Sequence, residues 1–152
     1  MTGSGDDRPA DTPETGEPAA ASPDARPVVL VVEDEDSLRG MLALVLDSAG
    51  FEAVLCPEGT TAVATLDGRD RLDAALLDLR MPGIPGTEVL ARIRRHSLHH
   101  AMPVIAMSAY SDESQARELR AQGATEFLPK PFAVAEVIAA LQRVMGHTPA
   151  GD

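Results

Sequence analysis

The fold of the chain is indicated by the stretch VVLVVEDEDSLRGMLALVLDSAG, residues 28–50. Its first five residues form a continuous apolar run, which is typical of a strand buried on both faces of a sheet. After the acidic residues 33–36, large apolar side chains recur every three or four residues. This spacing predicts a helix that Asp36 caps and Gly50 ends. A strand, a short link and a helix in this order begin an α/β fold.

The same alternation continues as far as residue 146. Apolar runs predict four more strands, at residues 51–56, 73–79, 103–108 and 125–128, and helical spacing predicts four more helices, at residues 60–68, 86–96, 112–123 and 133–146. Repeated strand–helix alternation with short links predicts a doubly wound (βα)5 domain, in which a five-stranded parallel sheet carries helices on both faces. The helix at 112–123 has little besides Leu119 to bury, so we expect it to be the least stable helix.

The two ends of the chain differ from the domain that we expect at residues 28–146. Residues 1–27 have no large apolar side chain after Met1, so we expect an acidic tail, rich in Pro and Ala, that is disordered. Residues 147–152 form a short C-terminal tail. No secretory signal and no apolar run long enough to cross a bilayer is present, and a single cysteine gives no disulfide framework. These features predict a cytoplasmic protein.

The net charge of the chain is −11. An acidic surface repels phosphate backbones and anionic lipid headgroups. We therefore expect neither direct nucleic-acid binding nor membrane binding.

Chemically active side chains follow the predicted strands at one edge of the sheet, where ligands bind in open parallel sheets. The acidic pair Glu33 and Asp34 follows the first strand, Asp78 ends the third, Ser108 ends the fourth and Lys130 follows the fifth. Clustered carboxylates offer the hard oxygen ligands that suit Mg²⁺. A carboxylate beside such an ion can attack phosphorus and form an aspartyl phosphate, while the lysine and the hydroxyl stabilise the moving phosphoryl group.

Lys130 is the only lysine among thirteen basic residues, and it stands between Pro129 and Pro131 in FLPKPF. Both prolines fix their own φ, and Pro131 also restricts Lys130 to an extended conformation. We interpret this constraint as a device that directs the ammonium group across the sheet edge toward Asp78.

Four motifs, VLVVEDEDSLR, LLDLRMPGIPG, PVIAMSAY and FLPKPF, resemble in their order and spacing the receiver domain of bacterial two-component response regulators. The resemblance covers residues 28–146 and implies the flavodoxin-like strand order 2-1-3-4-5, which is well known from a chemotaxis regulator of this family. It implies a protein that accepts a phosphoryl group from a histidine kinase or phosphotransfer protein, with Mg²⁺ or Mn²⁺ as cofactor. Such a protein is not a conventional enzyme but catalyses its own phosphorylation and slow dephosphorylation.

The resemblance also implies how the signal leaves the domain. Phosphorylation would shift the face made by the helix at 112–123, the strand at 125–128 and the helix at 133–146. The output would be protein–protein binding, from a monomer or from a dimer that forms on phosphorylation.

The resemblance further assigns a role to each matching position of the sheet edge. The roles are phosphoacceptor for Asp78; metal binding for Glu33, Asp34, Asp78 and the main-chain carbonyl of Arg80; phosphoryl binding or switching for Ser108, Lys130 and Phe127; and a cis Lys130–Pro131 bond. Apart from the resemblance, Arg80 and Tyr110 lie beside the site in the sequence, and we expect them to tune hydrolysis.

Some positions depart from the commonest pattern of the family. Glu33 stands where Asp is frequent, Asp36 where Pro is frequent, and Pro85 where Asp is frequent, and Phe127 lacks the hydroxyl of the more usual Tyr. None of these changes removes a required chemical group. We therefore predict an active receiver.

Other functions fit the residues less well. A phosphatase with an aspartate nucleophile would resemble DxD, but here Arg80 stands where its second Asp, the general acid, would be. A flavodoxin-like electron carrier would need a phosphate-binding loop after the first strand, where four acidic residues instead repel phosphate. A phosphoryl sink or relay, and a segment of a longer regulator, stay open. The intact Asp78, Asp34 and Lys130 argue against an interaction module that is not phosphorylated.

The remaining candidates for chemistry are interpreted as structural. We expect the histidines to lie on the surface, one group of arginines to form a solvated helix face, and the single cysteine to pack in the core. They are His96, His99, His100 and His147; Arg92, Arg94 and Arg95; and Cys56.

Overall fold

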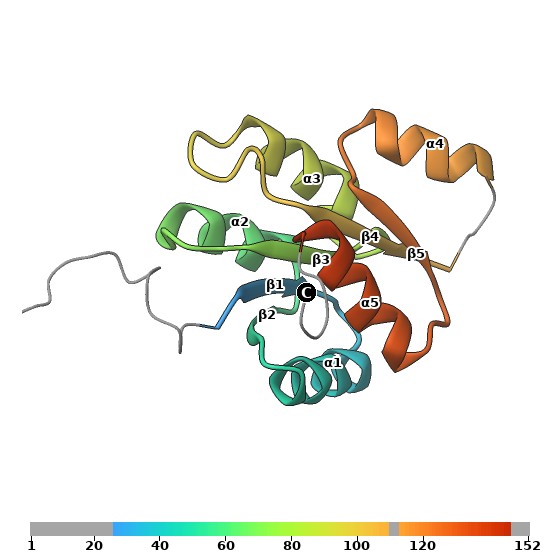
Figure 1. Ribbon diagram of the computed structural model, residues 1–152. Helices are drawn as coiled ribbons and strands as arrows, with labels where there is room; N and C mark the ends of the chain where they lie inside the picture. Colours follow the sequence, from blue (N-terminus) through green and yellow to red (C-terminus); the bar gives the residue numbers. More distant parts are fainter. Residues whose placement is uncertain (1–25, 110–112, 147–152) are drawn as a thin grey trace, which may run out of the picture.

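The structure, a computed structural model, describes residues 26–109 and 113–146. The predictions for Tyr110, for residues 147–152 and for nearly all of residues 1–27 lie outside these ranges. Strands and helices alternate without exception (Figure 1). They are β1 (Val28–Val32), α1 (Asp36–Ser48), β2 (Glu52–Cys56), α2 (Gly59–Gly68), β3 (Ala74–Asp78), α3 (Gly86–Arg95), β4 (Val104–Ser108), α4 (Glu113–Ala121), β5 (Glu126–Pro129) and α5 (Val134–Val144).

The five strands form one parallel sheet in the order β2-β1-β3-β4-β5, which confirms the predicted fold class and strand order. The order reverses between β1 and β3, because the chain winds outward from β1 in one direction to β2 and in the other to β3. Side chains beyond the carboxyl ends of these two strands therefore face the crevice where such sheets bind ligands.

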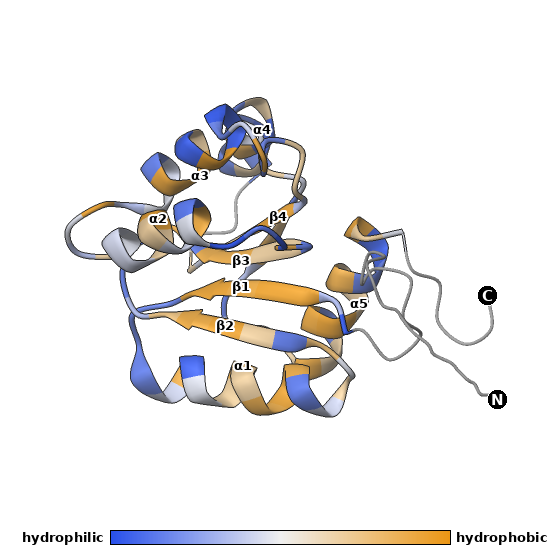
Figure 2. Ribbon diagram, turned by 90° about the vertical axis from the view of Figure 1, so that its left-hand side faces the viewer, coloured by the Kyte–Doolittle hydropathy of each residue, from blue (hydrophilic) through white to orange (hydrophobic). Residues whose placement is uncertain are grey.

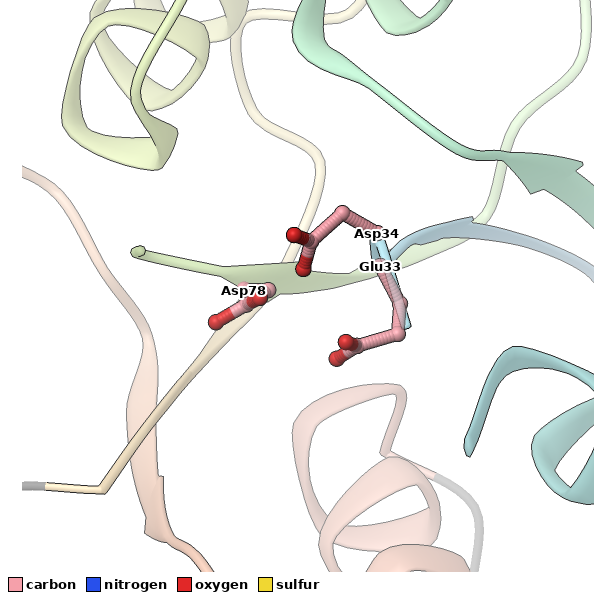
Figure 3. A group of neighbouring side chains, drawn as sticks. All are labelled: Glu33, Asp34 and Asp78. Atoms are coloured by element: carbon pink, nitrogen blue, oxygen red, sulfur yellow. The ribbon is translucent and has the colours of Figure 1, made fainter. Parts of the chain in front are cut away.

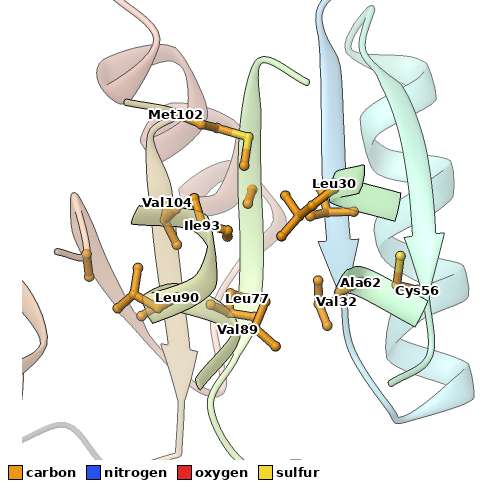
Figure 4. Close-up of a cluster of buried hydrophobic side chains, with 14 of the residues drawn as sticks. Leu30, Val32, Cys56, Ala62, Leu77, Val89, Leu90, Ile93, Met102 and Val104 are labelled. Carbon is orange, nitrogen blue, oxygen red and sulfur yellow. The ribbon is translucent and has the colours of Figure 1, made fainter. Parts of the chain in front are cut away.

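Both faces of the sheet are covered by helices, and alternate residues of β1 point to opposite faces. Val29 and Val31 pack with α1 and α5, whereas Leu30 and Val32 pack with α2, α3 and α4. Figure 4 shows the second of these clusters, and Figure 2 shows that β1 is apolar along its whole length. The continuous apolar run that predicted a strand buried on both faces is thus explained by two cores, one on each side.

The ends of α1 partly match the sequence-based prediction. Gly50 follows the helix with φ 94°, a left-handed conformation that favours glycine, so its predicted role at the end is confirmed. The predicted cap was wrong. Glu35 occupies the N-cap position without a capping side-chain bond, and Asp36 is the first helical residue, where its carboxylate contacts Arg39 at 2.6 Å instead.

Helix α4 buries one large side chain, Leu119, among its described residues, as predicted, and the colours of Figure 2 mark most of its residues as hydrophilic. Little apolar burial means that little free energy opposes the opening of this helix. This small buried apolar surface is consistent with the prediction that α4 is a helix of low stability.

Arg94 is not part of a solvated helix face, so that prediction was wrong. Its guanidinium group donates to the main-chain oxygens of Gly123, His100 and Met102, at 2.9, 3.0 and 2.6 Å. Burial lowers the pKa of this guanidinium. Arg94 thus joins α3 to the start of β4 and to the turn between α4 and β5.

The prediction of surface histidines was also wrong for His99 in the link after α3, whereas His100 in the same link is exposed as predicted. His99 is buried, and its Nε2 lies 2.8 Å from the main-chain oxygen of Arg69. The His96 ring stacks on it and contacts Asp67 at 3.1 Å, while His96 Nδ1 accepts the amide hydrogens of Leu98 and His99. Through these contacts the two rings join the link after α3 to the end of α2.

Cys56 is buried at the end of β2, in agreement with a packing role, and burial raises the pKa of its thiol. No helix within residues 26–109 and 113–146 combines the length and the apolar character that crossing a membrane requires.

Candidate functional site

Three carboxylates meet where β1 and β3 end (Figure 3). Val32 of β1 pairs with Leu77 of β3, so the residues that follow, Glu33 and Asp78, reach the sheet edge side by side. Asp34 comes next after Glu33. One oxygen from each of the three carboxylates lies within 4.8 Å of the others. Glu33 and Asp78 are 1% and 3% exposed, whereas Asp34 is open to solvent.

Lys130 enters the same group from β5. Its main-chain N–H donates to the Ser108 carbonyl at 2.7 Å, which continues the pairing of β5 with β4 for one residue beyond the strand. The Lys130–Pro131 peptide bond is cis, as the resemblance implied. The ammonium nitrogen Nζ lies 2.9 Å from Oε1 of Glu33 and 3.5 Å from Oδ1 of Asp78. The lysine therefore does point across the sheet edge, but its nearer partner is Glu33.

The pKa of Asp78 is raised from its ordinary value of 3.8 to about 6. Burial is the largest cause, and the negative charge of Glu33 adds to it, while the Arg80 N–H and the Lys130 charge act in the opposite direction. For Lys130, burial alone would lower the pKa, but the hydrogen bond to Glu33 and the charges of Glu33 and Asp78 outweigh it and raise the pKa. The lysine therefore stays protonated at neutral pH, whereas the raised pKa of Asp78 lies close to neutral pH.

Main-chain groups fix two of the carboxylates. The Glu35 N–H donates to Oε2 of Glu33 at 3.0 Å, and the Arg80 N–H donates to Oδ1 of Asp78 at 3.2 Å. Because both acceptors are charged, these bonds are stronger than those between neutral groups. The side chain of Glu33, one methylene longer than Asp, spans the distance from the end of β1 to Lys130 without losing its main-chain bond.

Ser108 and Phe127, the other residues expected at this edge, take different positions. Ser108 is the buried last residue of β4, next to β3 in the sheet. Phe127 lies in β5 opposite Ala106 and packs, half-buried, against the cluster under α2, α3 and α4. Their roles in switching stay predictions.

Gly86, at the start of α3, packs against the main chain of Asp78, a feature that the sequence did not predict. A Cβ atom at this position would overlap the main-chain oxygen of Asp78 and lie 2.7 Å from the Cα atom of Leu79. Only glycine lets the first turn of α3 approach the end of β3 so closely. The signal in the sequence is a glycine directly after Pro85, a pair that by itself indicates no more than a turn.

Arg39 is a second residue that was missed. From the first turn of α1 its guanidinium donates to the main-chain oxygens of Glu33 and Asp34 and to the carboxylate of Asp36. The only hint is its place at the end of the motif VLVVEDEDSLR.

The donor set is suited to a hard divalent cation. Carboxylate oxygens converge from three side chains, and the exposed position of Asp34 leaves room for water molecules, which Mg²⁺ commonly retains in protein sites. The main-chain carbonyl of Arg80, the fourth expected ligand, belongs to the residue two positions after Asp78. The residues present therefore fit such an ion.

The sequence of this chain is similar to those of a known domain family. Residues 29–142 match the model of the response regulator receiver domain. The DNA-binding transcriptional regulator NtrC of Salmonella typhimurium is 37% identical over 122 residues, which cover 80% of this chain and 25% of that protein. The sensory transduction protein RegX3 of Mycobacterium tuberculosis is 38% identical over 117 residues, covering 77% and 50%. The chain thus spans a quarter to a half of the length of these relatives.

Solved structures show the same likeness over nearly their whole length. The Vibrio cholerae chemotaxis protein CheY4 superposes with a TM-score of 0.75 at 32% identity, covering 79% of this chain and 99% of that one. The receiver domain of the sensor histidine kinase PA1611 from Pseudomonas aeruginosa has a TM-score of 0.73 at 30% identity, covering 80% and 99%. That structure has a magnesium ion coordinated in its active-site cleft.

Proposed function

Because the chain belongs to the response regulator receiver domain family, we propose that Asp78 is the residue on which it is phosphorylated during signalling. Receiver domains are the phosphorylation-activated signalling domains of two-component systems. The observation that carries the assignment is the position of Asp78. It is a buried carboxylate at the end of β3, beside two further carboxylates and 3.5 Å from a lysine ammonium group.

The geometry supports a direct transfer from a phosphohistidine. A carboxylate oxygen of Asp78 attacks the phosphorus atom, the bond between phosphorus and the donor's imidazole nitrogen breaks, and its electron pair returns to the imidazole. The product is an acyl phosphate on Asp78. A pKa of about 6 leaves most of the Asp78 carboxylate ionised at neutral pH, in the form that attacks. Lys130 offsets negative charge on the phosphoryl oxygens, and Ser108 offers a hydroxyl donor.

Receiver domains generally bind Mg²⁺ at an acidic pocket, and this chain has a cluster of acidic residues at the corresponding place. In our proposal the carboxylates of Glu33, Asp34 and Asp78 and the carbonyl of Arg80 hold Mg²⁺ or Mn²⁺. When bound, the ion neutralises part of the charge that gathers around the phosphoryl group. The chain's own residues do the rest: they position the nucleophile and supply the ammonium group.

The partners follow from the family in outline. Receiver domains interact with histidine kinases or phosphotransfer proteins, and we propose one of these as the donor for Asp78. A hollow of about 510 Å³ opens beside Lys130 between α1 and the start of α5, lined by Leu38, Met41 and Phe132 among others. An imidazole-bearing helix could approach the site from this side.

For the output we propose protein–protein binding through the face of α4, β5 and α5. Ser108 turns toward the phosphoryl group, Phe127 moves into the space that is freed, and α4, with its single large buried side chain, shifts. DNA binding, which the name of NtrC states for that longer protein, is not proposed for this chain.

The test uses acetyl phosphate and Mg²⁺ on the full chain, with the intact mass as the readout. The wild type gains the mass of one phosphoryl group, Asp78→Asn gains none, and Asp47→Asn, which changes an exposed aspartate on α1, gains as much as the wild type. A wild type that gains no mass, or an Asp78→Asn variant that still does, would overturn the assignment.

A further inference from the structure

Arg39 holds the main chain of the acidic residues that follow β1. Its Nη1 atom lies 2.9 Å from the carbonyl oxygen of Glu33 and 3.5 Å from that of Asp34. Its Nη2 atom lies 2.6 Å from Oδ1 of Asp36. The Arg39 side chain is 18% exposed. Its contact with Glu33 is partly buried, whereas its contacts with Asp34 and Asp36 are open to solvent. One planar group thus contacts Glu33 and Asp34, which follow β1, and Asp36, the first residue of α1.

The link needs such support because it belongs to neither neighbouring element. Residues 33–35 lie between the end of β1 and the start of α1, without a regular strand or helix conformation. The Glu33 N–H is still bonded to the carbonyl of Cys56 in β2, and the Arg39 N–H to the Glu35 carbonyl in the first turn of α1. Between these two points, the Arg39 side chain is the group that contacts the carbonyls of Glu33 and Asp34.

We propose that Arg39 is a positioning residue for the divalent-cation site. By holding the carbonyls of Glu33 and Asp34, it fixes the directions in which their carboxylates leave the main chain, and so sets the affinity of the site for Mg²⁺. This inference rests on the proposed function, since it takes Glu33 and Asp34 to be metal-binding residues. Partners of metal ligands commonly change metal affinity by about 10- to 100-fold when they are removed.

A second role for Arg39, as a plain positive charge, makes the opposite prediction. A guanidinium group close to the site repels a cation, so its removal would strengthen Mg²⁺ binding if charge alone mattered. Removal of a positioning group weakens binding. Replacement by lysine keeps the charge but loses the planar fork that contacts two carbonyls and a carboxylate together. The lysine variant therefore distinguishes the two roles a second time. If charge alone mattered, its affinity for Mg²⁺ would equal that of the wild type.

Asp36 contributes through Arg39, and weakly. Its carboxylate is 90% exposed, and exposed ion pairs contribute little because water and salt screen them. Asp36 stands at a position where the family more often has proline. Its carboxylate contacts Nη2 of Arg39, whereas the two carbonyl contacts are made by Nη1 and should persist without it. The Asp36→Asn change should weaken Mg²⁺ binding slightly in the wild type and have no effect once Arg39 is alanine.

The experiment is calorimetric titration of the metal-free full chain with Mg²⁺, well below the unfolding midpoint of each variant. We expect Arg39→Ala to bind about tenfold more weakly and Arg39→Lys several-fold more weakly. The matched control is Arg92→Ala, which removes an arginine paired with Glu88 on α3 and should bind like the wild type. Thermal unfolding of the metal-free variants shows which are folded, and Arg39→Lys serves if Arg39→Ala is not.

Each outcome has a distinct meaning. Equal or tighter binding by Arg39→Ala and Arg39→Lys, with normal binding by the wild type, overturns the positioning role and leaves the proposed function intact. A wild type that does not bind Mg²⁺ overturns the proposed metal site and this inference together. An Asp36→Asn effect of the same size with and without Arg39 overturns the link from Asp36 through Arg39.

Discussion

The ammonium group of Lys130 lies 2.9 Å from Oε1 of Glu33 and 0.6 Å farther, at 3.5 Å, from Oδ1 of Asp78. The two residues are 97 positions apart in the sequence. They meet because β1 and β5 are parallel strands of one sheet and end at the same edge of it. In the unphosphorylated domain the lysine is therefore bonded mainly to a residue other than the proposed phosphoacceptor. Its release from Glu33 toward a phosphoryl oxygen would be part of activation.

Lys130→Arg should permit phosphorylation of Asp78 but weaken the response to it. A planar guanidinium cannot replace a compact ammonium group between two carboxylates without displacing one of them. The measurement pairs intact mass, for phosphorylation, with amide NMR spectra of α4 and β5 before and after phosphodonor is added. Spectral changes equal to those of the wild type would count against the role that we assign to Lys130.

Asp78→Asn should stabilise the metal-free domain at neutral pH. The folded-state pKa of about 6 exceeds the ordinary value of 3.8, so between these values the folded state binds more protons than the unfolded state. The free energy of unfolding of the wild type therefore falls as the pH rises through this window. Above about pH 6 the ionised Asp78 carboxylate destabilises the folded state to its full extent. We expect Asp78→Asn to be more stable than the wild type by roughly 1–3 kcal/mol at pH 7.5, with little difference at pH 4.

Urea unfolding in the presence of a chelator, at both pH values, provides the measurement. The control is Asp47→Asn, which removes an exposed carboxylate paired with Arg26 and should give no such pH-dependent gain. An Asp78→Asn variant whose stability difference from the wild type is the same at pH 4 and pH 7.5 would contradict the raised pKa.

Gly86→Ala should destabilise the domain and disturb the site. The new methyl group would overlap main-chain atoms of Asp78 and Leu79, which cannot move aside as a flexible side chain could. Overpacking of this kind costs roughly 1–3 kcal/mol. Gly40→Ala is the control, because a Cβ atom there has no neighbour within 4 Å and alanine favours the helix by up to about 1 kcal/mol. If Gly86→Ala were as stable as the wild type in unfolding curves, α3 would be able to move away from the end of β3 without a loss of stability, which contradicts this prediction.

Arg94→Ala should loosen the corner between α4 and β5. It removes the donor to three main-chain oxygens, of which that of His100 is exposed, and a hydrogen bond with a charged partner has a net contribution of about 1.5–3 kcal/mol. We expect a net loss of roughly 2–3 kcal/mol in the free energy of unfolding, with faster hydrogen exchange at the amides of Gly123 and Ala124. Arg95→Ala, which changes the neighbouring and more exposed arginine, should leave both nearly unchanged. Equal exchange in the two variants would refute the anchoring role of Arg94.

The order of the elements, and the edge at which chemistry gathers, could be predicted from the order of the residues alone. Strands buried on both faces must be apolar throughout, and helices that cover a sheet must repeat every three or four residues, so both leave a local pattern. In a parallel sheet all strands end at one edge, which is why Asp78 and Lys130 could be expected together before their distance was known.

Which side chains meet at that edge and elsewhere became known only from the folded domain. Glu33 rather than Asp78 is the nearer partner of Lys130, Arg94 and His99 are anchors rather than surface groups, and Arg39 supports the acidic link. Local patterns record burial and main-chain conformation, but a long polar side chain reaches partners far away in sequence. Which partner it finds depends on strand register and on the space that a residue such as Gly86 leaves open, and both are set only once the sheet has formed.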